Sequence, residues 1–478
     1  MQANYKRVMP AIWLALALTA PAARGFARMD LWLTDPDRSV LFEKQNESLV
    51  LGKVANVTPG TNSAGNNYQI IDVSDFQTFQ TIDGFGACLT GGSAVHLMGM
   101  DANRRAALLK ELFATGSTNI GISYLRVSIG ASDLNDHVFS YDDLPAGETD
   151  PGMTKFSLGP DRADVIPVLK QILAIAPHIK ILGSPWSPPP WMKDNHDTRG
   201  GSLKPEFYDA YAKYFVKYIQ GMKAEGIRID AITVQNEPLN HKNNPSLVMR
   251  APEEAAFIKD HLGPAFKAAK IHTKIILYDH NCDRPDYPIS ILNDPAASKY
   301  VDGSAFHLYG GRIEAMSEVH NAYPDKNLYF TEQWTGASDR LKWALDDHVS
   351  ALIVGATRNW SRNVLEWNLA ADSSYEPHTD RGGCDRCMGC VTIDGNKVTR
   401  NAGYYILASA AKFVRPGSVR IDSNDLQSLP NVAFETPSGG KVLIVLNNTR
   451  SPLNFGIRFT SRVANATLNG GAVGTYVW

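Results

Sequence analysis

Short apolar segments alternate with longer amphipathic stretches through most of the chain. The apolar segments lack the polar alternation of half-exposed strands, which is typical of parallel strands that are buried on both faces. Eight such strands are predicted, at residues 81–87, 123–130, 179–186, 230–238, 273–281, 303–310, 327–334 and 363–370.

The stretches between these strands have a helical period. From Pro205 to Gly226 the apolar residues recur every three or four positions, as in a helix that packs one face on a core. Asp164 can cap a further helix, and residues 251–270 and 339–360 have the same pattern. Strands that alternate with helices in this way predict an α/β fold, a closed (β/α)8 TIM barrel. No Gly-x-Gly-x-x-Gly turn or Walker-type loop follows any of these strands, which counts against an open nucleotide-binding sheet.

The two ends of the chain have a different pattern. Residues 38–79 and 417–478 contain alternating segments without a helical period, and Gly, Pro and Asn separate them. This pattern predicts antiparallel strands. We therefore expect one β-sandwich beside the barrel, with N-terminal strands within residues 26–79, the barrel at 80–412 and C-terminal strands at 413–478.

The first residues have the pattern of a secretory signal. Lys6 and Arg7 precede an uncharged stretch over residues 8–23, which ends in small residues. We expect a cleaved signal peptide at residues 1–25 and a protein that is secreted or periplasmic. An uncleaved anchor is the alternative. No other segment approaches the ~18 apolar residues of a membrane span, so no integral span is expected in the mature chain.

Composition and charge exclude several classes of protein. The 478 residues are 44% hydrophobic and 20% charged, as in ordinary globular proteins. The 47 Lys and Arg residues against 49 Asp and Glu residues give a net charge of −2. Because this balance supplies no cationic field, we expect no nucleic-acid partner. We expect a monomer without a cofactor.

The five cysteines are compatible with export, which permits disulfides. Cys384, Cys387 and Cys390 form a C-x-x-C-x-x-C pattern in a Gly-rich segment. A metal site would need a fourth ligand at a suitable spacing, so a small disulfide-closed loop is the better interpretation. Cys88 and Cys282 are either buried thiols or a second bridge. Because five is an odd number, at least one cysteine lacks an intrachain partner, and the pairing stays open.

Two of the predicted strands end in a glutamate. Glu237 closes the fourth strand and Glu332 closes the seventh. Either residue alone could be an exposed loop carboxylate or part of an ion pair. Strands four and seven are three steps apart around an eight-stranded ring, however, so the two carboxylates can face one another across the barrel mouth. Two opposed carboxylates, one protonated and one ionised, are what the cleavage of a glycosidic bond requires.

Residues suited to sugar binding lie near the same strand ends. Asn236 precedes Glu237 and could donate a hydrogen bond to a sugar 2-hydroxyl. Candidates for stacking on sugar ring faces are Trp186, Trp334 and Trp367. Candidates for binding sugar hydroxyls are Arg126, Asp133, His307, Tyr309 and Asn368. His307 has an alternative interpretation as a hydrogen-bonded histidine at a strand end, and the three tryptophans could be packing residues at the rim.

The motifs at these strand ends resemble those of glycoside hydrolase family 30, whose members include glucosylceramidases. The motifs occur in order along nearly the whole mature chain and read DGFGA, YLRVSIGASD, GSPWSPPPWMK, TVQNEP, YDHN, FHLYG, YFTEQW and EWNLA. The resemblance implies a retaining mechanism with Glu237 as acid/base and Glu332 as nucleophile. It also implies that Arg126, Asp133, Trp186, Asn236, Tyr309 and Trp367 line a glucose-binding subsite.

This mechanism sets physical requirements for the two glutamates. Their carboxyls should lie about 5–5.5 Å apart, against about 6.5–9.5 Å in an inverting enzyme. Glu332 must stay ionised, which hydrogen bonds from Arg126 or Tyr309 would favour. Glu237 must hold a proton, and we expect the nearby charge of Glu332 to raise the pKa of Glu237.

The substrate is less well determined than the reaction. A β-glucoside of the glucosylceramide type is the first candidate, and β-1,6-glucan, cleaved internally by a secreted enzyme, is the alternative. The segment around Cys384 departs from the animal glucosylceramidase pattern and is more like that of members that act on β-1,6-glucan, or of bacterial relatives labelled glucosylceramidase. The xylan-active branch is disfavoured, because no clear basic cluster for an acidic substituent is found. Two other classes remain: a non-catalytic sugar-binding barrel, and a zinc hydrolase centred on the cysteines and His307.

Overall fold

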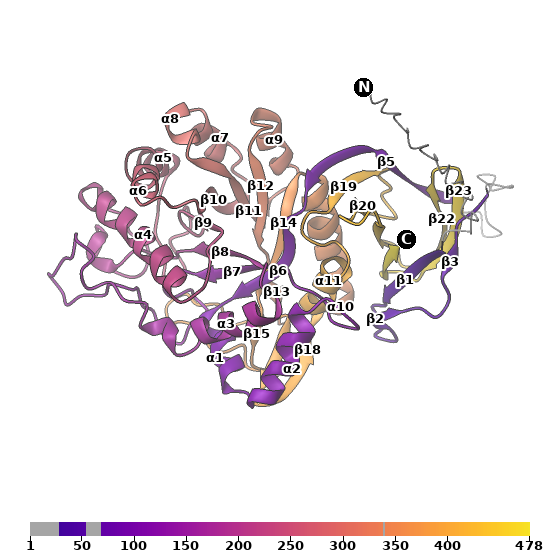
Figure 1. The fold of residues 1–478 in the computed structure, drawn as a ribbon, viewed down its shortest axis with the longest axis horizontal. Helices are drawn as coiled ribbons and strands as arrows, with labels where there is room; N and C mark the ends of the chain where they lie inside the picture. Colours follow the sequence, from indigo (N-terminus) through magenta and orange to yellow (C-terminus); the bar gives the residue numbers. More distant parts are fainter. Residues whose placement is uncertain (1–27, 54–67, 338–339) are drawn as a thin grey trace, which may run out of the picture.

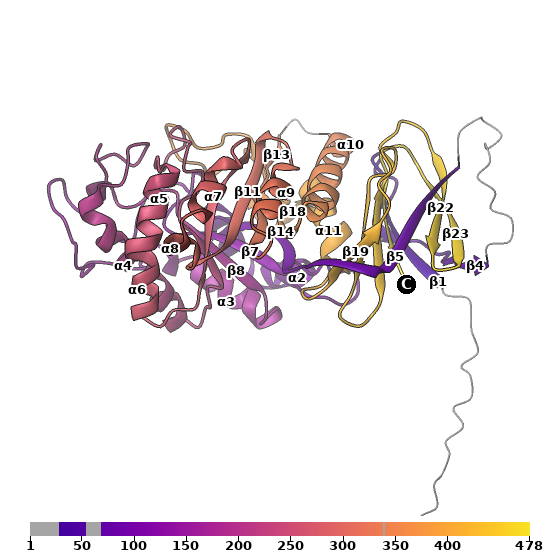
Figure 2. The same cartoon turned by 90° about the horizontal axis from the view of Figure 1, so that it is seen from above.

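The protein consists of a barrel and a β-sandwich that lie side by side (Figure 1). The computed structural model describes residues 28–53, 68–337 and 340–478. The predicted signal peptide, residues 1–25, lies outside the described residues. Seen from above, the sandwich covers one side of the barrel, and the long strand β5 (Gln69–Thr81) leads from the sandwich to the first barrel strand (Figure 2).

The barrel is closed by eight parallel strands, which confirms the predicted fold. The strands are β6 (Gly84–Leu89), β7 (Tyr124–Ser128), β8 (Lys180–Ser184), β9 (Ala231–Thr233), β10 (Lys274–Cys282), β11 (Val301–Gly311), β12 (Asn327–Glu332) and β14 (Ser361–Asn368). Each overlaps one of the eight predicted segments. They follow one another around the ring in chain order, so β9 and β12 are three steps apart, as expected.

Helices surround the barrel. The α-helices are α1 (Gly91–Gly99), α2 (Ala102–Phe113), α3 (Val165–Ile175), α4 (Tyr208–Ala224), α5 (Ala251–Phe257), α6 (Gly263–Ala268), α7 (Asp286–Leu292), α8 (Pro295–Ser298), α9 (Ala315–Ala322), α10 (Leu341–Ala344) and α11 (Ala402–Ala411). Two π-helical segments, η4 (Ile258–Leu262) and η5 (Leu345–Ala356), continue α5 and α10, and short 3-10 turns are η1 (Pro160–Arg162), η2 (Pro190–Met192) and η3 (Pro205–Phe207).

The local sequence explains these helices. Asp164 caps α3, because its carboxylate accepts a hydrogen bond of 2.5 Å from the backbone N–H of Val165. Helix α4 buries the predicted apolar stripe, including Tyr211, Phe215 and Met222, against the barrel. Seven apolar residues, one from each of seven barrel strands, form a buried cluster: Tyr124, Leu182, Ala231, Ile276, Ala305, Tyr329 and Leu365. The barrel is therefore a packed core, and the strand ends form its open face.

The sandwich is built from both ends of the chain. It is formed by β1 (Arg28–Thr34), β2 (Leu41–Lys44), β3 (Leu49–Val50), β4 (Gly52–Lys53), β5, β19 (Val419–Ser423), β20 (Asn431–Glu435), β21 (Lys441–Leu446), β22 (Leu453–Phe459), β23 (Arg462–Leu468) and β24 (Val473–Val477). Strand β1 pairs with the last strand, β24, and β5 pairs with β19 and β22. A separate hydrophobic core, which includes Ile71, Leu443 and Phe455, fills the space between its layers.

Short strands follow the C-terminal ends of β12 and β14 along the chain. They are β13 (Thr335–Gly336), β15 (Ala370–Ala371), β16 (Cys387–Met388), β17 (Val391–Asp394) and β18 (Lys397–Arg400). β16 pairs with β13, and β17 joins β15 and β18 in a small sheet. In the part of the chain that the structure describes, no helix has the length and apolar character needed to cross a membrane.

Candidate active site

Glu237 lies four residues beyond the end of β9, in a strained backbone conformation. Its φ of 45° is in the left-handed region, which is unfavourable by about 1–3 kcal/mol for a residue with a side chain. Two backbone hydrogen bonds hold this turn: Asn236 donates to the carbonyl of Pro185 at 2.8 Å, and Glu237 donates to that of Asp279 at 3.0 Å. The neighbouring strands β8 and β10 thus fix where the Glu237 side chain enters the mouth.

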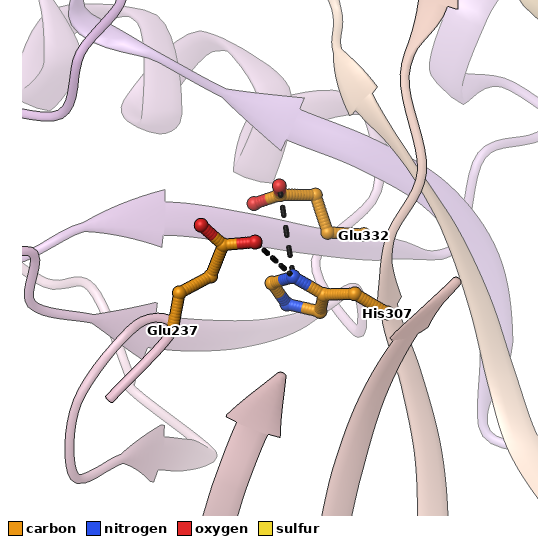
Figure 3. A group of neighbouring side chains, drawn as sticks. All are labelled: Glu237, His307 and Glu332. Atoms are coloured by element: carbon orange, nitrogen blue, oxygen red, sulfur yellow. Dashed lines mark hydrogen bonds and ion pairs between the residues drawn. The ribbon is translucent and has the colours of Figure 1, made fainter. Parts of the chain in front are cut away.

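Glu332 is the last residue of β12, and it faces Glu237 across the mouth (Figure 3). A carboxylate oxygen of Glu237 and one of Glu332 lie within 4.8 Å of each other and of a ring nitrogen of His307. The two glutamates are only 7% and 5% exposed. The structure therefore brings together the two carboxylates that the strand ends predict.

Arg126, on β7, forms a buried ion pair with Glu332. Its guanidinium is fully buried and donates to Glu332 at 2.5 Å. It also donates to Asn236 at 2.6 Å and to Asp279 at 2.8 Å. Tyr309 donates from its hydroxyl to the other oxygen of Glu332 at 3.0 Å. Both oxygens of Glu332 thus receive hydrogen bonds, which favour the ionised form.

Asp279 is the centre of the hydrogen-bond network, and the sequence analysis did not single it out. It is completely buried at the bulged end of β10. Its carboxylate accepts hydrogen bonds from the side chains of Arg126, Ser184, Thr233, Thr331 and His307. Burial would raise the pKa of Asp279, but Arg126 and His307 outweigh it and hold the pKa well below its usual range. The signal that could have found it is the one used for the glutamates, a carboxylate at a strand end in YDHN.

His307, on β11, lies between three carboxylates rather than free for a sugar hydroxyl. Its Nε2 is 3.1 Å from Asp279, and its Nδ1 is 3.3 Å from Glu237 and 3.7 Å from Glu332. Burial opposes a charge on the ring, but the neighbouring carboxylates outweigh it and raise the pKa of His307 to about 9. The imidazole is therefore protonated at neutral pH, with both N–H groups directed at carboxylates.

The charge on His307 reverses one expectation for Glu237. We expected its pKa to be raised by Glu332. Burial does favour a higher pKa, but the hydrogen bond and the charge of His307 outweigh burial and lower the pKa of Glu237 to about 2. Burial raises the pKa of Glu332, against the opposing charges of His307 and Arg126. In the resting site the shared proton is thus on His307, next to Glu237.

Two asparagines that the sequence analysis missed also contact Glu237. Asn240 donates to its Oε2 at 2.7 Å, and Asn243 approaches the same oxygen at 3.4 Å. Both lie in the loop that follows Glu237, at a spacing that matches no predicted helix or strand. Their role is therefore visible only in three dimensions.

The polar candidates for sugar binding take different positions. Asp133 lies in the loop after β7 and is 6% exposed; burial, with the charges of Glu332 and Glu237, raises its pKa to about 8. Tyr309 is 40% exposed at the rim. Asn236 accepts from Arg126 at the base of the site. The side-chain oxygen of Asn368 accepts from the hydroxyls of Thr90 and Ser93, so it is held by α1 and the turn before it.

The three predicted tryptophans form one cluster. Trp186 and Trp367 are 1% and 3% exposed, with ring centres 5.2 Å apart. The guanidinium of Arg126 lies 4.8 Å from the Trp186 ring centre. The face of Trp186 therefore supports Arg126, where a sugar ring was expected. Trp334 is half-buried and packs against the same cluster, so it has the most accessible ring of the three.

The cysteines resolve into one disulfide and three thiols. Cys384 and Cys387 are bonded to each other, and Cys88, Cys282 and Cys390 are free and buried. The small disulfide-closed loop is thus confirmed. A bonded pair cannot supply the thiolates of a zinc site. The cysteine-centred zinc hydrolase is therefore wrong for this oxidised form.

The cluster of Glu237, His307 and Glu332 has donor atoms close enough to approach a cation. The raised pKa of His307, however, leaves its Nδ1 carrying a proton that faces both carboxylates. A metal ion would have to displace this proton before the nitrogen could bind it. Arg126 already supplies a positive charge to Glu332. The arrangement suits proton transfer better than metal binding.

Comparison with known proteins identifies the family. Residues 82–414 match the glycosyl hydrolase family 30 TIM-barrel domain, and residues 417–476 match the family's beta sandwich domain. The chain belongs to glycoside hydrolase family 30. It is therefore an O-glycosyl hydrolase, and the non-catalytic sugar-binding barrel is no longer needed as an interpretation.

Relatives within family 30 include enzymes of both substrate classes. The chain is 36% identical to an endo-1,6-beta-D-glucanase of Neurospora crassa, over 82% of this chain and 83% of the relative. It is 28% identical to the lysosomal acid glucosylceramidase of Mus musculus, over 84% of this chain and 81% of the relative. The solved structure of the endo-beta1,6-glucanase BT3312 is 34% identical and superposes with a TM-score of 0.83, covering 95% of this chain and 99% of that one.

Proposed function

We propose that this family 30 enzyme is an exported, retaining endo-β-1,6-glucanase in which Glu332 is the nucleophile and Glu237 the acid/base. One observation carries the proposal: oxygens of the two carboxylates lie within 4.8 Å across the barrel mouth. This spacing suits direct attack by one carboxylate, whereas an inverting enzyme needs about 6.5–9.5 Å to admit a water.

The environments of the two glutamates support these roles. Glu332 receives hydrogen bonds from Arg126 and Tyr309, which keep it ionised for attack on the anomeric carbon. Glu237 lies beside the proton on His307, at 3.3 Å. His307 first passes its proton to Glu237, and as the glycosidic bond breaks Glu237 gives this proton to the leaving oxygen and is left ionised. Glu332 is then esterified to the sugar, and Glu237 takes a proton from the water that releases the product.

The loss of the Glu332 charge in this intermediate changes the proton balance. The raised pKa of His307 depends in part on Glu332. Once Glu332 is esterified, that contribution disappears, so His307 has less tendency to take up a new proton. Glu237, now ionised, is the base that activates water. One cluster thereby serves both half-reactions.

The rim of the site favours a glucan over a lipid. A ceramide would require an exposed apolar entrance. Among the described residues, the exposed large hydrophobic side chains are Val50, Phe76, Val95, Tyr309 and Trp343. Of these, Tyr309 alone contacts a candidate catalytic group. The higher identity to endo-1,6-glucanases supports the same order.

Product analysis on two substrates tests the proposal. We expect β-1,6-glucan (pustulan) to yield a ladder of β-1,6-linked oligosaccharides, and glucosylceramide to be cleaved at least about 100-fold more slowly. An aryl β-glucoside and an aryl β-xyloside serve as controls for the glycone. Faster cleavage of glucosylceramide than of pustulan would contradict the glucanase assignment. Export is tested separately, by N-terminal sequencing of the mature protein, which should begin after residues 22–27.

A further inference from the structure

Residues 376–388, the disulfide segment, connect the tryptophan cluster to the loops that follow β7 and β9. At its C-terminal end, Cys387 and Met388 pair with Thr335 and Gly336, directly after Trp334. Cys387 is buried in the same cluster as the tryptophans, and its disulfide to Cys384 closes this end of the segment. One end of the disulfide segment is therefore fixed to the tryptophan cluster.

The other end is fixed to two loops at once through Thr379. This residue is 2% exposed, and its backbone N–H donates to the carbonyl of Asp133 at 2.9 Å. Its hydroxyl donates to the carbonyl of Asn244. Asp133 belongs to the loop after β7, and Asn244 belongs to the loop that carries Glu237. Thr379 thus joins a candidate sugar-binding loop to the loop of the acid/base.

Asn244 strengthens this junction. Asn244 is 1% exposed. Its side-chain amide donates to the backbone carbonyl of Asp380 at 3.0 Å and to the carboxylate of Asp380 at 2.9 Å. Its side-chain oxygen accepts from the hydroxyl of Thr198 at 2.7 Å. Thr198 lies in the loop after β8. A buried asparagine with these bonds cannot move without leaving polar groups unpaired. The disulfide segment and three loops of the mouth are therefore one connected unit.

The backbone contact is equally close. A Cβ on Gly382 would lie 2.3 Å from the carbonyl oxygen of Lys242, and the φ of Gly382 is 144°. Only glycine fits there. Lys242 precedes Asn243, which together with Asn240 contacts the carboxylate of Glu237. The disulfide segment thus packs closely against the part of the loop that orients Glu237.

We propose that the disulfide segment is a positioning element for proton donation by Glu237, with Thr379 as its positioning residue and the Cys384–Cys387 bond as its anchor. The proposal rests on the assignment of Glu237 as acid/base. Among the described residues, no side chain of the disulfide segment forms a hydrogen bond with either carboxylate. We infer that the segment acts through Asn244 and the loop that holds Asn240 and Asn243.

A defect in proton donation has a signature that general loss of structure lacks. A leaving group of low pKa departs without protonation, whereas a poor one needs the acid. Displacing Glu237 should therefore slow the hydrolysis of poor substrates while sparing activated ones. Misfolding or loss of Glu332 would slow both alike.

The test uses Thr379→Val and the double variant Cys384→Ser/Cys387→Ser on aryl β-glucosides that range from 2,4-dinitrophenyl to phenyl. We expect kcat/KM to fall about 10-fold or more on the phenyl glucoside and to stay within about 3-fold on the dinitrophenyl glucoside. Thr475→Val is the matched control. Thr475, on the sandwich strand β24, is equally buried and donates to the carbonyl of Ser409 in helix α11 at 2.7 Å. It should lower Tm without changing the dependence on leaving group.

An equal loss across the series, or no loss in either variant, would overturn the proposal. If the double variant does not fold, the wild type treated with a phosphine reductant replaces it, with thiol labelling to show that Cys384 and Cys387 are reduced. Glu237→Ala is the reference for complete loss of proton donation. If that variant shows no dependence on the leaving group, the role of Glu237 fails, and this result is distinct from a failure confined to the disulfide segment.

Discussion

The guanidinium of Arg126 lies 2.5 Å from the carboxylate of Glu332, and the two side chains are 0% and 7% exposed. The same guanidinium lies 2.8 Å from the buried carboxylate of Asp279. Moving these three charged groups out of water costs free energy. Their mutual attraction offsets that cost only when the geometry is good and the hydrogen bonds are satisfied. The gain from this arrangement is therefore orientation: Arg126 fixes one oxygen of Glu332 and leaves the carboxylate ionised.

Replacing Arg126 by alanine should lower both the stability and the catalytic activity of the enzyme. Two buried carboxylates would lose their counter-charge, which costs about 3–5 kcal/mol of unfolding free energy. We also expect kcat on an aryl β-glucoside to fall about 100-fold or more, because Glu332 loses the group that orients it. Urea unfolding and initial rates measure the two effects.

Arg458→Ala is the control for the Arg126 variant. Arg458 pairs with Asp72 in the sandwich, where the two side chains are 42% and 43% exposed. An exposed pair of this kind contributes less than about 1 kcal/mol. An Arg126→Ala variant as stable as Arg458→Ala would contradict the inference that Arg126 compensates two buried charges.

Glu332→Gln should abolish turnover with little change in shape. The amide cannot form the ester intermediate, so we expect kcat to fall about 10,000-fold or more on every substrate, activated ones included. A 2-fluoro-glucoside with a good leaving group should label the wild type on the peptide that contains Glu332. Glu366→Gln is the control. Glu366 is a buried glutamate on β14 that is hydrogen-bonded to His348, and the variant should remain active at temperatures below its Tm. Label on another residue would refute the assignment.

The barrel could be predicted from the sequence because its signal is local. Each strand is a short apolar run, and each crossover helix repeats its stripe within about twenty residues. The predicted segment 230–238 is longer than the observed β9, which ends at Thr233. The chain leaves the barrel there to make the turn that holds Glu237. The pairing of β1 with β24 joins residues more than 400 positions apart, so no local pattern could set its register.

The site was predictable in part for the same reason. A carboxylate directly after an apolar strand is visible in a sequence, and this signal gave Glu237 and Glu332. It was equally present at Asp279, which stood in a quoted motif but received no role. The contact between Thr379 and Asn244 spans 135 positions and has no sequence signal. The shift of the Glu237 pKa depends on His307, and only a distance could show that.

Glu237→Ala should separate the two half-reactions. Substrates with activated leaving groups can still form the glycosyl-enzyme on Glu332. The hydrolysis of pustulan needs protonation of the leaving group, so its rate should fall about 100-fold or more. Azide can then enter the space left by the carboxylate and attack the intermediate. We expect partial recovery of the rate on dinitrophenyl β-glucoside and a β-glucosyl azide as product, identified by NMR.

Two results would count against this role for Glu237. An α-glucosyl azide would mean that the glycosyl-enzyme is not formed with inversion on Glu332. An equal loss on dinitrophenyl glucoside and pustulan, without azide recovery, would mean that Glu237 does not act as an acid. Asn240→Ala is a milder comparison, because it removes one donor to Glu237 and leaves the carboxylate in place.

His307 should make the stability of the enzyme depend on pH above neutrality. Its pKa is about 9 in the folded protein, against about 6.5 when unfolded, so the folded state binds the extra proton between these values. The resulting stabilisation is fully present below pH 6.5 and is lost as the pH rises through 9. The difference between these two pKa values corresponds to about 3 kcal/mol.

Urea unfolding of the wild type and of His307→Gln at pH 6, 7.5 and 9.5 measures this dependence. The advantage of the wild type over the variant should be largest at pH 6 and should shrink towards pH 9.5. His137→Gln, which changes a histidine with a side chain 66% exposed, should follow the wild type at every pH. An advantage that stays constant from pH 6 to 9.5 would show that His307 is neutral in the folded site. The proton for the leaving group would then have to reside on Glu237 itself.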